Sequence, residues 1–231
     1  MTSLNELHFN IDEFEGSKMV YIIPDNFGTF ESEIAIYYNK KKSKTKNKDE
    51  KIKKKEDLED ASNKLFLKTP KMYCPFDPSE SKYTYEGNTY TAPYRNLALS
   101  FRHIGHLYNE DKVDKLKKFV AMVDDVNREI IITNSSILVK KKKKSETISF
   151  KNCIVKSDNY PDHCIVNVLP GRNDTPIIGV FDENGKPSDF SIIKKNSIVS
   201  CILEIRSIKL KTKKCEFRTV YVVHQIRKWK E

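Results

Sequence analysis

The stretch IRSIKLKTKKCEFRTVYVV, residues 205–223, constrains the fold of this chain more than any other. Its apolar residues alternate on both sides of a short KTKK turn, which is the pattern of a β-hairpin, yet it carries six Lys or Arg and one Glu. Alternation divides the first strand into an inward and an outward face. The inward residues are Val199, Cys201, Leu203 and Ile205, and the outward residues include Ser200, Glu204 and Arg206.

The returning strand follows the same rule. One side consists of Val220, Val222, His224 and Ile226, and the other of Tyr221, Val223, Gln225 and Arg227. Two interpretations of the charge remain open. The cations form a basic groove along a phosphate backbone beside aromatic faces, or they are edge-strand lysines that prevent sheet aggregation. The density of positive charge favours binding.

The residues expected to contact nucleic acid are the hairpin cations, the basic and aromatic residues after the turn, part of a five-lysine run, and one tyrosine of an aromatic-rich loop. They are Arg206, Lys209, Lys211, Lys213, Lys214, Arg218, Tyr221, Arg227, Trp229, Lys140, Lys141, Lys142 and Tyr94.

Composition describes a soluble globular protein with highly charged segments. The chain has 231 residues, of which 38% are hydrophobic and 32% charged, and its mean hydropathy is −0.61. A net charge of +10 favours an acidic partner: nucleic acid, an anionic membrane surface or an acidic protein. No apolar run approaches the roughly 20 residues of a membrane span, and the N-terminus has no signal-peptide pattern. We expect an intracellular, soluble protein without membrane insertion.

The segment 39–64 differs from the rest of the chain in composition, since it has eleven Lys, six acids and almost no apolar residue to bury. Such a composition predicts disorder, either as a solvated linker or as a basic arm that contacts phosphate. We therefore expect a single nucleic-acid-binding domain over residues 1–231 with a disordered Lys-rich insertion at 40–63.

The remaining sequence predicts an α+β, mainly β fold. Alternating residues indicate strands within 17–26 and 30–39, at 65–67, at 94–101 and through most of the second half of the chain. One amphipathic helix is expected over 109–131, capped by Asn109, with Asp124 and Asp125 as solubilising charge. The short strands and turn signals suit a small barrel.

Motifs for catalysis are missing from the sequence. No phosphate-binding glycine loop, nucleophile elbow or zinc-protease motif occurs, and the five cysteines include no CxxC pair. His163 and Cys164 are neighbours on a strand and so point to opposite faces. His224 is expected to be a hydrogen-bonded, half-buried histidine. We expect no enzymatic activity, no cofactor and no metal.

The order of four segments also resembles a known family, the single-stranded-DNA-binding proteins of large nucleocytoplasmic DNA viruses. The segments are LFLKTPKMYCPFD, YRNLALSF, DKLKKFVAMVDDVNREII and VFDENGKPSDFSIIKKNSIVSCILEIRSIKLKTKKCEFRTVYVVHQI, which cover most of residues 65–226. The resemblance implies an OB-like β-barrel core with helical additions and a non-enzymatic role in viral DNA replication, recombination or repair. The insertion at 39–64 and the lysines at 140–144 depart from the family, and the family offers no short site motif to transfer.

The leading hypothesis is thus a protein that coats and protects unwound DNA strands without sequence preference. Its expected partners are single-stranded DNA, RNA and duplex DNA more weakly, other replication proteins and further copies of itself. Its expected location is the viral replication site, a cytoplasmic factory or the nucleus, or the virion. The alternative is a basic structural or virion protein that packages duplex DNA or bridges acidic partners. A nuclease or other DNA-processing enzyme is the third hypothesis.

Overall fold

The computed structural model describes residues 10–23, 33–38, 64–85, 88–102, 110–135, 148–169, 178–211 and 215–230, with the backbone alone for 80–95. These ranges contain twelve strands and one long α-helix, α1 (Glu110–Thr133). The prediction of a mainly β fold with one prominent helix is confirmed. Four predicted features lie outside the described residues: the Lys-rich insertion, the lysine run at 140–144, the Asn109 cap, and residues Lys213 and Lys214 of the hairpin turn.

The described chain divides into two compact units, each assembled from three separate segments. Unit 1 comprises 1–66, 119–153 and 205–220, and unit 2 comprises 67–118, 154–204 and 221–231. Four elements contribute residues to both units: β3 (Leu65–Lys68), α1, β11 (Ile198–Lys211) and β12 (Glu216–Trp229).

Unit 1 contains an antiparallel sheet in which β2 (Glu33–Tyr38) lies between β1 (Met19–Ile22) and β11. Alternate residues of β2 are buried, as the sequence predicts, beginning with Ile34, which is paired with the buried Ile208 of β11. The short strand β7 (Ser149–Lys151) pairs with β12 in parallel.

The part of α1 in unit 1 packs through aromatic and close backbone contacts. Phe14 lies edge-on to Phe119 with ring centroids 5.0 Å apart, and it stacks on Tyr38 at 5.9 Å. A short 3-10 helix, Gly16–Lys18, approaches α1 so closely that a methyl group at Gly16 would lie 2.8 Å from Cγ2 of Val126. The glycine is therefore required by the approach of backbone to helix.

A buried polar network follows on the same face of α1. The Asp124 carboxylate accepts hydrogen bonds from the Cys153 amide at 2.6 Å and the Thr219 hydroxyl at 2.7 Å. Asn127 donates to Thr219 at 2.9 Å and accepts from the Tyr21 hydroxyl at 2.8 Å. Burial raises the pKa of Asp124 above its ordinary value, against the opposing effect of these hydrogen bonds. The prediction that Asp124 is surface charge is wrong, since its residue is 2% exposed.

Unit 2 is built on five strands that are hydrogen-bonded neighbours in the order β11, β4 (Met72–Tyr73), β6 (Asn88–Ser100), β9 (His163–Val168) and β12; β11 also pairs with β12. Two short strands add to this set, β8 (Ile154–Val155) beside β9 and β10 (Gly179–Phe181) beside β12. The predicted Asn-Gly turn follows β10: Gly185 has a φ of +80°, and Asp182 accepts from two amides within it.

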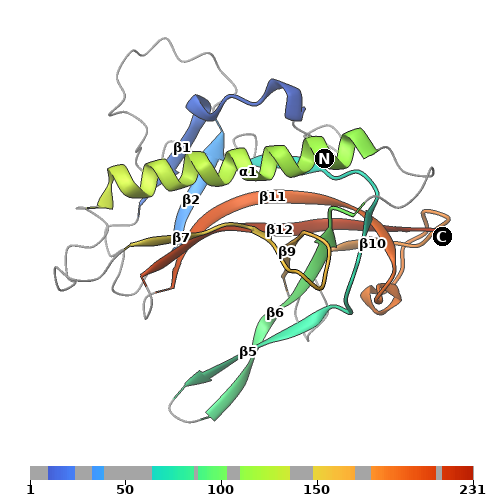
Figure 1. Cartoon of the computed structure of the whole chain (residues 1–231). Coiled ribbons are helices and arrows are strands. Elements are labelled where there is room, and N and C mark those ends of the chain that lie inside the picture. Colours follow the sequence, from blue (N-terminus) through green and yellow to red (C-terminus); the bar gives the residue numbers. More distant parts are fainter. Residues whose placement is uncertain are drawn as a thin grey trace. The chain divides into compact units, whose positions relative to one another are not determined.

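One hairpin of unit 2 has no counterpart in the predicted elements. β5 (Ser79–Tyr85) pairs with the first part of β6, and the two strands extend as a ribbon beyond the other strands of unit 2 (Figure 1). The sequence predicts an aromatic-rich loop followed by a strand from Tyr94. The loop prediction is wrong, because β5 and the first part of β6 form a hairpin there. The residues YTYEGNTYT contain the aromatic and β-branched residues of two short strands around a glycine, which is the signal for this hairpin.

Candidate nucleic-acid interface

The predicted DNA-binding residues of the two hairpin strands are divided between the two units. Arg206, Lys209, Lys211 and Arg218 belong to unit 1, whereas Arg227 and Trp229 belong to unit 2. Arg206 and Lys209 are three residues apart on β11 and so lie on opposite faces of the strand. Lys209 forms an ion pair with Glu33 at 3.3 Å. Lys211 and Arg218 are exposed, and their contact with DNA stays a prediction.

The predicted outward face of the hairpin is wrong at Tyr221 and Glu204. Tyr221 is 2% exposed, and Glu204 is 4% exposed with its carboxylate 2.6 Å from Nε2 of His224. The half-buried His224 therefore has a hydrogen-bond partner, as predicted. Both faces of these strands are covered, because Ile202 and Val223 add buried apolar side chains to the face that alternation assigns to solvent. A ring as buried as Tyr221 is not placed to stack on a base.

An exposed aromatic pair lies elsewhere in unit 2. Tyr160, in the loop before β9, is 54% exposed, and its ring lies edge-on to Phe76 with centroids 5.0 Å apart. Phe76 is also edge-on to His163 at 5.6 Å, and His163 is buried. The half-buried Phe76 therefore contacts both the buried histidine and the exposed tyrosine.

Cations lie on the segments that adjoin this aromatic pair. Lys117 of α1 forms an ion pair with Asp162 at 2.8 Å, two residues after Tyr160. The Phe101 amide donates to the Asp162 carbonyl at 2.8 Å, which brings the adjacent, exposed Arg102 to this loop.

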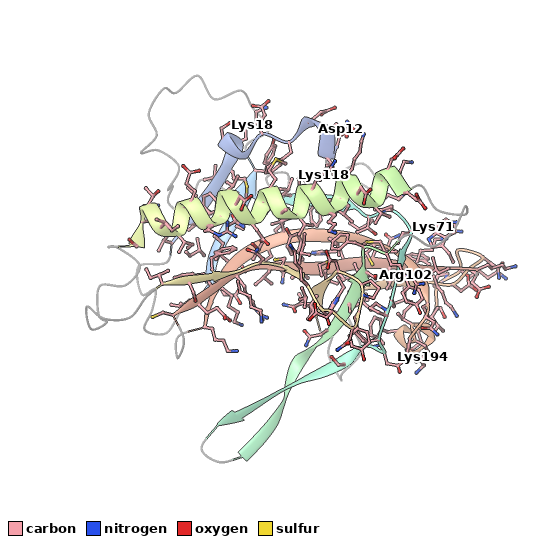
Figure 2. The ribbon with its side chains drawn as sticks, viewed as in Figure 1. Asp12, Lys18, Lys71, Arg102, Lys118 and Lys194 are labelled. Carbon is pink, nitrogen blue, oxygen red and sulfur yellow. The ribbon has the colours of Figure 1, made fainter. Side chains whose placement is uncertain are left out.

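A third cation belongs to a residue whose backbone is bonded next to Phe76. The Lys195 amide donates to Asp77, the residue after Phe76, at 2.8 Å, and the Lys195 side chain is exposed. We call Phe76, Tyr160, Arg102, Lys117 and Lys195 the aromatic–basic cluster. In Figure 2, Lys71, Arg102 and Lys194 extend from unit 2 at the right of the view.

An open strip of β6 and β9 continues from the cluster. Ile165 of β9, two residues beyond His163 and hence on the same face, is 45% exposed. Its cross-strand partner is Ala98, and the next pair on this face is Asn167 with Asn96. Ile165 is thus the exposed apolar residue of a face on which Ala98, Asn96 and Asn167 are half-buried.

Trp229 also lies in unit 2, and its ring is surrounded by specific contacts. Its indole N–H donates to the Ser200 hydroxyl at 3.0 Å. The Lys71 ammonium and the Arg227 guanidinium lie over the ring, 4.2 and 4.1 Å from its centroid. Of the aromatic residues predicted to contact DNA, Trp229 is the one that the structure places beside cations; the side chain of Tyr94 lies outside the described residues.

Two of the cysteines are fully buried in unit 2. Burial raises the pKa of the Cys74 thiol to about 12, and that of the Cys201 thiol is raised as well. In the ranges that the structure covers, no three His, Cys, Asp or Glu side chains are grouped so that they could hold a metal ion. None of the helices described there is long and apolar enough to cross a membrane.

The aromatic–basic cluster has little signal in the sequence. Phe76 belongs to the aromatic-rich region before Tyr94, but Tyr160, Arg102 and Lys195 stand alone among unrelated residues. They come together only because the loop before β9, the end of β6 and the loop before β11 meet in unit 2. A search for isolated aromatics in polar loops, such as SDNYPD around Tyr160, would have found one of the three.

Comparison with known proteins yields a viral relative and a set of distant structural likenesses. An uncharacterized protein of Acanthamoeba polyphaga mimivirus is 32% identical over 168 residues. The match covers 72% of this chain and 26% of that protein, so the chain spans about a quarter of its relative's length. A relative in a large DNA virus agrees with the viral part of the resemblance. No family model matches the chain.

Two of the similar solved structures are of the single-stranded DNA-binding protein from bacteriophage Enc34. The one in complex with single-stranded DNA is 13% identical, with a TM-score of 0.40 over 72% of this chain and 86% of that chain. The one with a C-terminal truncation is 12% identical, with the same TM-score and coverage.

Proposed function

We propose that this chain binds single-stranded DNA without sequence preference and that unit 2 carries the binding surface. The observation on which the proposal rests is Tyr160, a 54% exposed residue whose ring lies edge-on to Phe76, with the cations Arg102, Lys117 and Lys195 on the segments that adjoin this pair. Exposed aromatic rings beside cations are the common arrangement of proteins that bind unpaired nucleic acid.

Two contributions to DNA affinity support the proposal, base stacking and counterion release. A base stacked on an aromatic side chain contributes about 1–3 kcal/mol and tolerates any base, because every base has a π face. Lys and Arg near the phosphates release condensed counterions, which adds affinity without reading the sequence. The aromatic–basic cluster offers both stacking and counterion release. Duplex DNA would gain only from counterion release, because its bases are already stacked on each other.

The proposed path of the DNA strand runs from the aromatic–basic cluster along the strip of Ile165 and Ala98. In this proposal the pairings among β11, β4, β6, β9 and β12 close an OB-like barrel, and the strip is its outer face. OB barrels hold about 4–16 nucleotides in such a groove.

The proposal includes a non-enzymatic role. The protein would coat and protect unwound strands during viral DNA replication, recombination or repair, at the replication site of the host cell. The buried thiols and the dispersed acids of the described residues support binding rather than catalysis. Contact with RNA, with other replication proteins and between copies of the chain belongs to the same proposal.

The test is competition binding with single-stranded DNA, duplex DNA and RNA of equal length, combined with variants of Tyr160. Tyr160→Leu should weaken single-strand binding about 5- to 150-fold, whereas Tyr160→Phe should retain it because the ring remains. Ile132→Ala is the matched control, since Ile132 is a 63% exposed apolar residue of α1 in unit 1. Equal affinity of wild type and Tyr160→Leu, with duplex DNA competing as well as single strands, would contradict the proposal and favour the duplex-packaging alternative.

A further inference from the structure

Trp229 is held in place by its own indole N–H. The bond to Ser200 at 3.0 Å joins β12 to β11 within unit 2 and fixes the ring plane. With this N–H already paired, the indole has no donor left for the edge of a base. What it can offer a ligand is its π face.

Two cations share that ring. Both lie close to its centroid, so the distance between the two charges is at most the sum of 4.2 and 4.1 Å. Charges of the same sign at such a separation repel each other, and the indole offsets part of that repulsion through its quadrupole. A negatively charged ligand at this position would be attracted by both cations.

Arg227 is the fixed cation of the pair. It is two residues before Trp229 on β12 and therefore on the same face of the strand. Its Nη2 donates to the Glu183 carbonyl at 3.4 Å, and a methyl group at Gly185 would lie 3.6 Å from the same nitrogen. Among the described residues, its buried Nε has no hydrogen-bond partner.

Lys71 is the replaceable cation. It stands before β4, and its ammonium reaches the ring at the end of a flexible four-carbon stem. Lys71 is half-buried; its ammonium contacts the indole as one charged group, whereas a base stacks over the whole ring face and gains more from that contact. A base can therefore take the place of the ammonium at a net gain.

We propose that Trp229 is a base-stacking subsite whose ring face Lys71 covers until DNA binds. When a base stacks on the indole, the Lys71 ammonium moves off the ring and pairs with the phosphate of that nucleotide, while Arg227 continues to support the ring. The subsite takes any unpaired base. This inference rests on the proposed function and names a second point of contact for it.

Trp229 is the only tryptophan in the sequence, so its fluorescence reports on this subsite alone. The experiment titrates the full chain with labelled oligothymidylate and follows two signals together: anisotropy of the DNA label, which measures binding, and emission of Trp229. We expect the emission to be quenched in proportion to the bound fraction. We also expect bound DNA to protect the indole from acrylamide.

Variants separate stacking from charge. Trp229→Leu should weaken binding about 5- to 150-fold with an unchanged salt slope, and Trp229→Phe should restore most of the affinity. Lys71→Met should make the slope of log affinity against log salt shallower by about 0.7, the single-strand value for one phosphate. Lys68→Met is the matched control, an exposed lysine of unit 2 three residues earlier. Unfolding midpoints are measured for every variant.

Two outcomes would overturn the inference. One of them leaves the proposed function intact, and the other contradicts it as well. If DNA binds by anisotropy while Trp229 emission and acrylamide quenching stay unchanged, the subsite is refuted and the proposed function stands. If the oligonucleotide does not bind at all, the proposed function fails together with the subsite.

Discussion

The Thr219 hydroxyl of β12 donates a 2.7 Å hydrogen bond to the Asp124 carboxylate of α1, and both residues are buried. The same hydroxyl oxygen accepts from Asn127 at 2.9 Å. A threonine that both donates and accepts in the interior fixes the position of the helix relative to the strand within unit 1. This contact predicts where the stability of unit 1 is most sensitive to substitution.

Asp124→Ala should lower the free energy of unfolding by about 2–3 kcal/mol, because it leaves the part-buried Cys153 amide and the buried Thr219 hydroxyl without their acceptor. Urea unfolding followed by circular dichroism measures the change. Asp125→Ala is the control: Asp125 is exposed and forms a surface ion pair with Arg128 at 2.7 Å, so its removal should change stability by less than about 0.5 kcal/mol. Equal effects of the two substitutions would show that Asp124 is not part of a buried network.

The same carboxylate predicts a pH dependence. Burial raises the pKa of Asp124 in the folded state, so the folded chain holds its proton at pH values where the unfolded chain has released it. Stability must then fall as pH rises from about 4, the ordinary Asp value, through the raised pKa, and stay level above it. The quantity to measure is the unfolding free energy of wild type minus that of Asp124→Asn, across this range. A difference that rises with pH would show that the pKa is lowered instead.

Gly16→Ala should destabilise unit 1 by about 1–3 kcal/mol, since the new methyl group would lie 2.8 Å from Cγ2 of Val126. Valine in a helix has one strongly preferred rotamer and cannot easily turn aside. The double variant Gly16→Ala, Val126→Ala removes the clashing methyl group, so the two changes should be non-additive in unfolding measurements. Strict additivity would place the cost of Gly16→Ala in the backbone rather than in this contact.

Two sets of cations make different predictions about the DNA path. Replacing Arg102 and Lys195 with Gln should make the salt slope shallower by about 0.7 for each phosphate that is no longer neutralised. Replacing Lys211 and Arg218 with Gln tests the hairpin in the same assay. If the second pair changes the slope and the first does not, the strand follows the hairpin and the aromatic–basic cluster is not its site.

The elements that could be predicted from the sequence are those whose apolar period is regular. The helix at 110–133, predicted over 109–131, and the strand at 33–38 follow from spacing alone, because one buried face imposes the period on the residues. The rule failed where both faces are buried. Ile202 and Val223 continue the apolar run through positions assigned to solvent, and a period of two cannot distinguish a half-buried strand from one covered on both sides.

The polar interior was also beyond the reach of periodicity. Asp124 stands next to Asp125 in the sequence, and nothing local says that one is buried and the other exposed. The difference arises because the Cys153 amide and the Thr219 hydroxyl, both far away in the chain, supply donors for the first carboxylate only. The aromatic–basic cluster was hidden for the same reason, since its members meet through contacts between distant segments.

The division of β12 between two units affects when the chain can fold during its synthesis on the ribosome. Unit 1 takes its third segment from 205–220, and unit 2 takes its third from 221–231. Neither unit has all of its segments until β12 has been synthesised, so the usual order, in which an N-terminal domain folds while the rest is translated, is not open to these two units. Translation that stalls before β12 leaves both units incomplete and their strand edges open to aggregation.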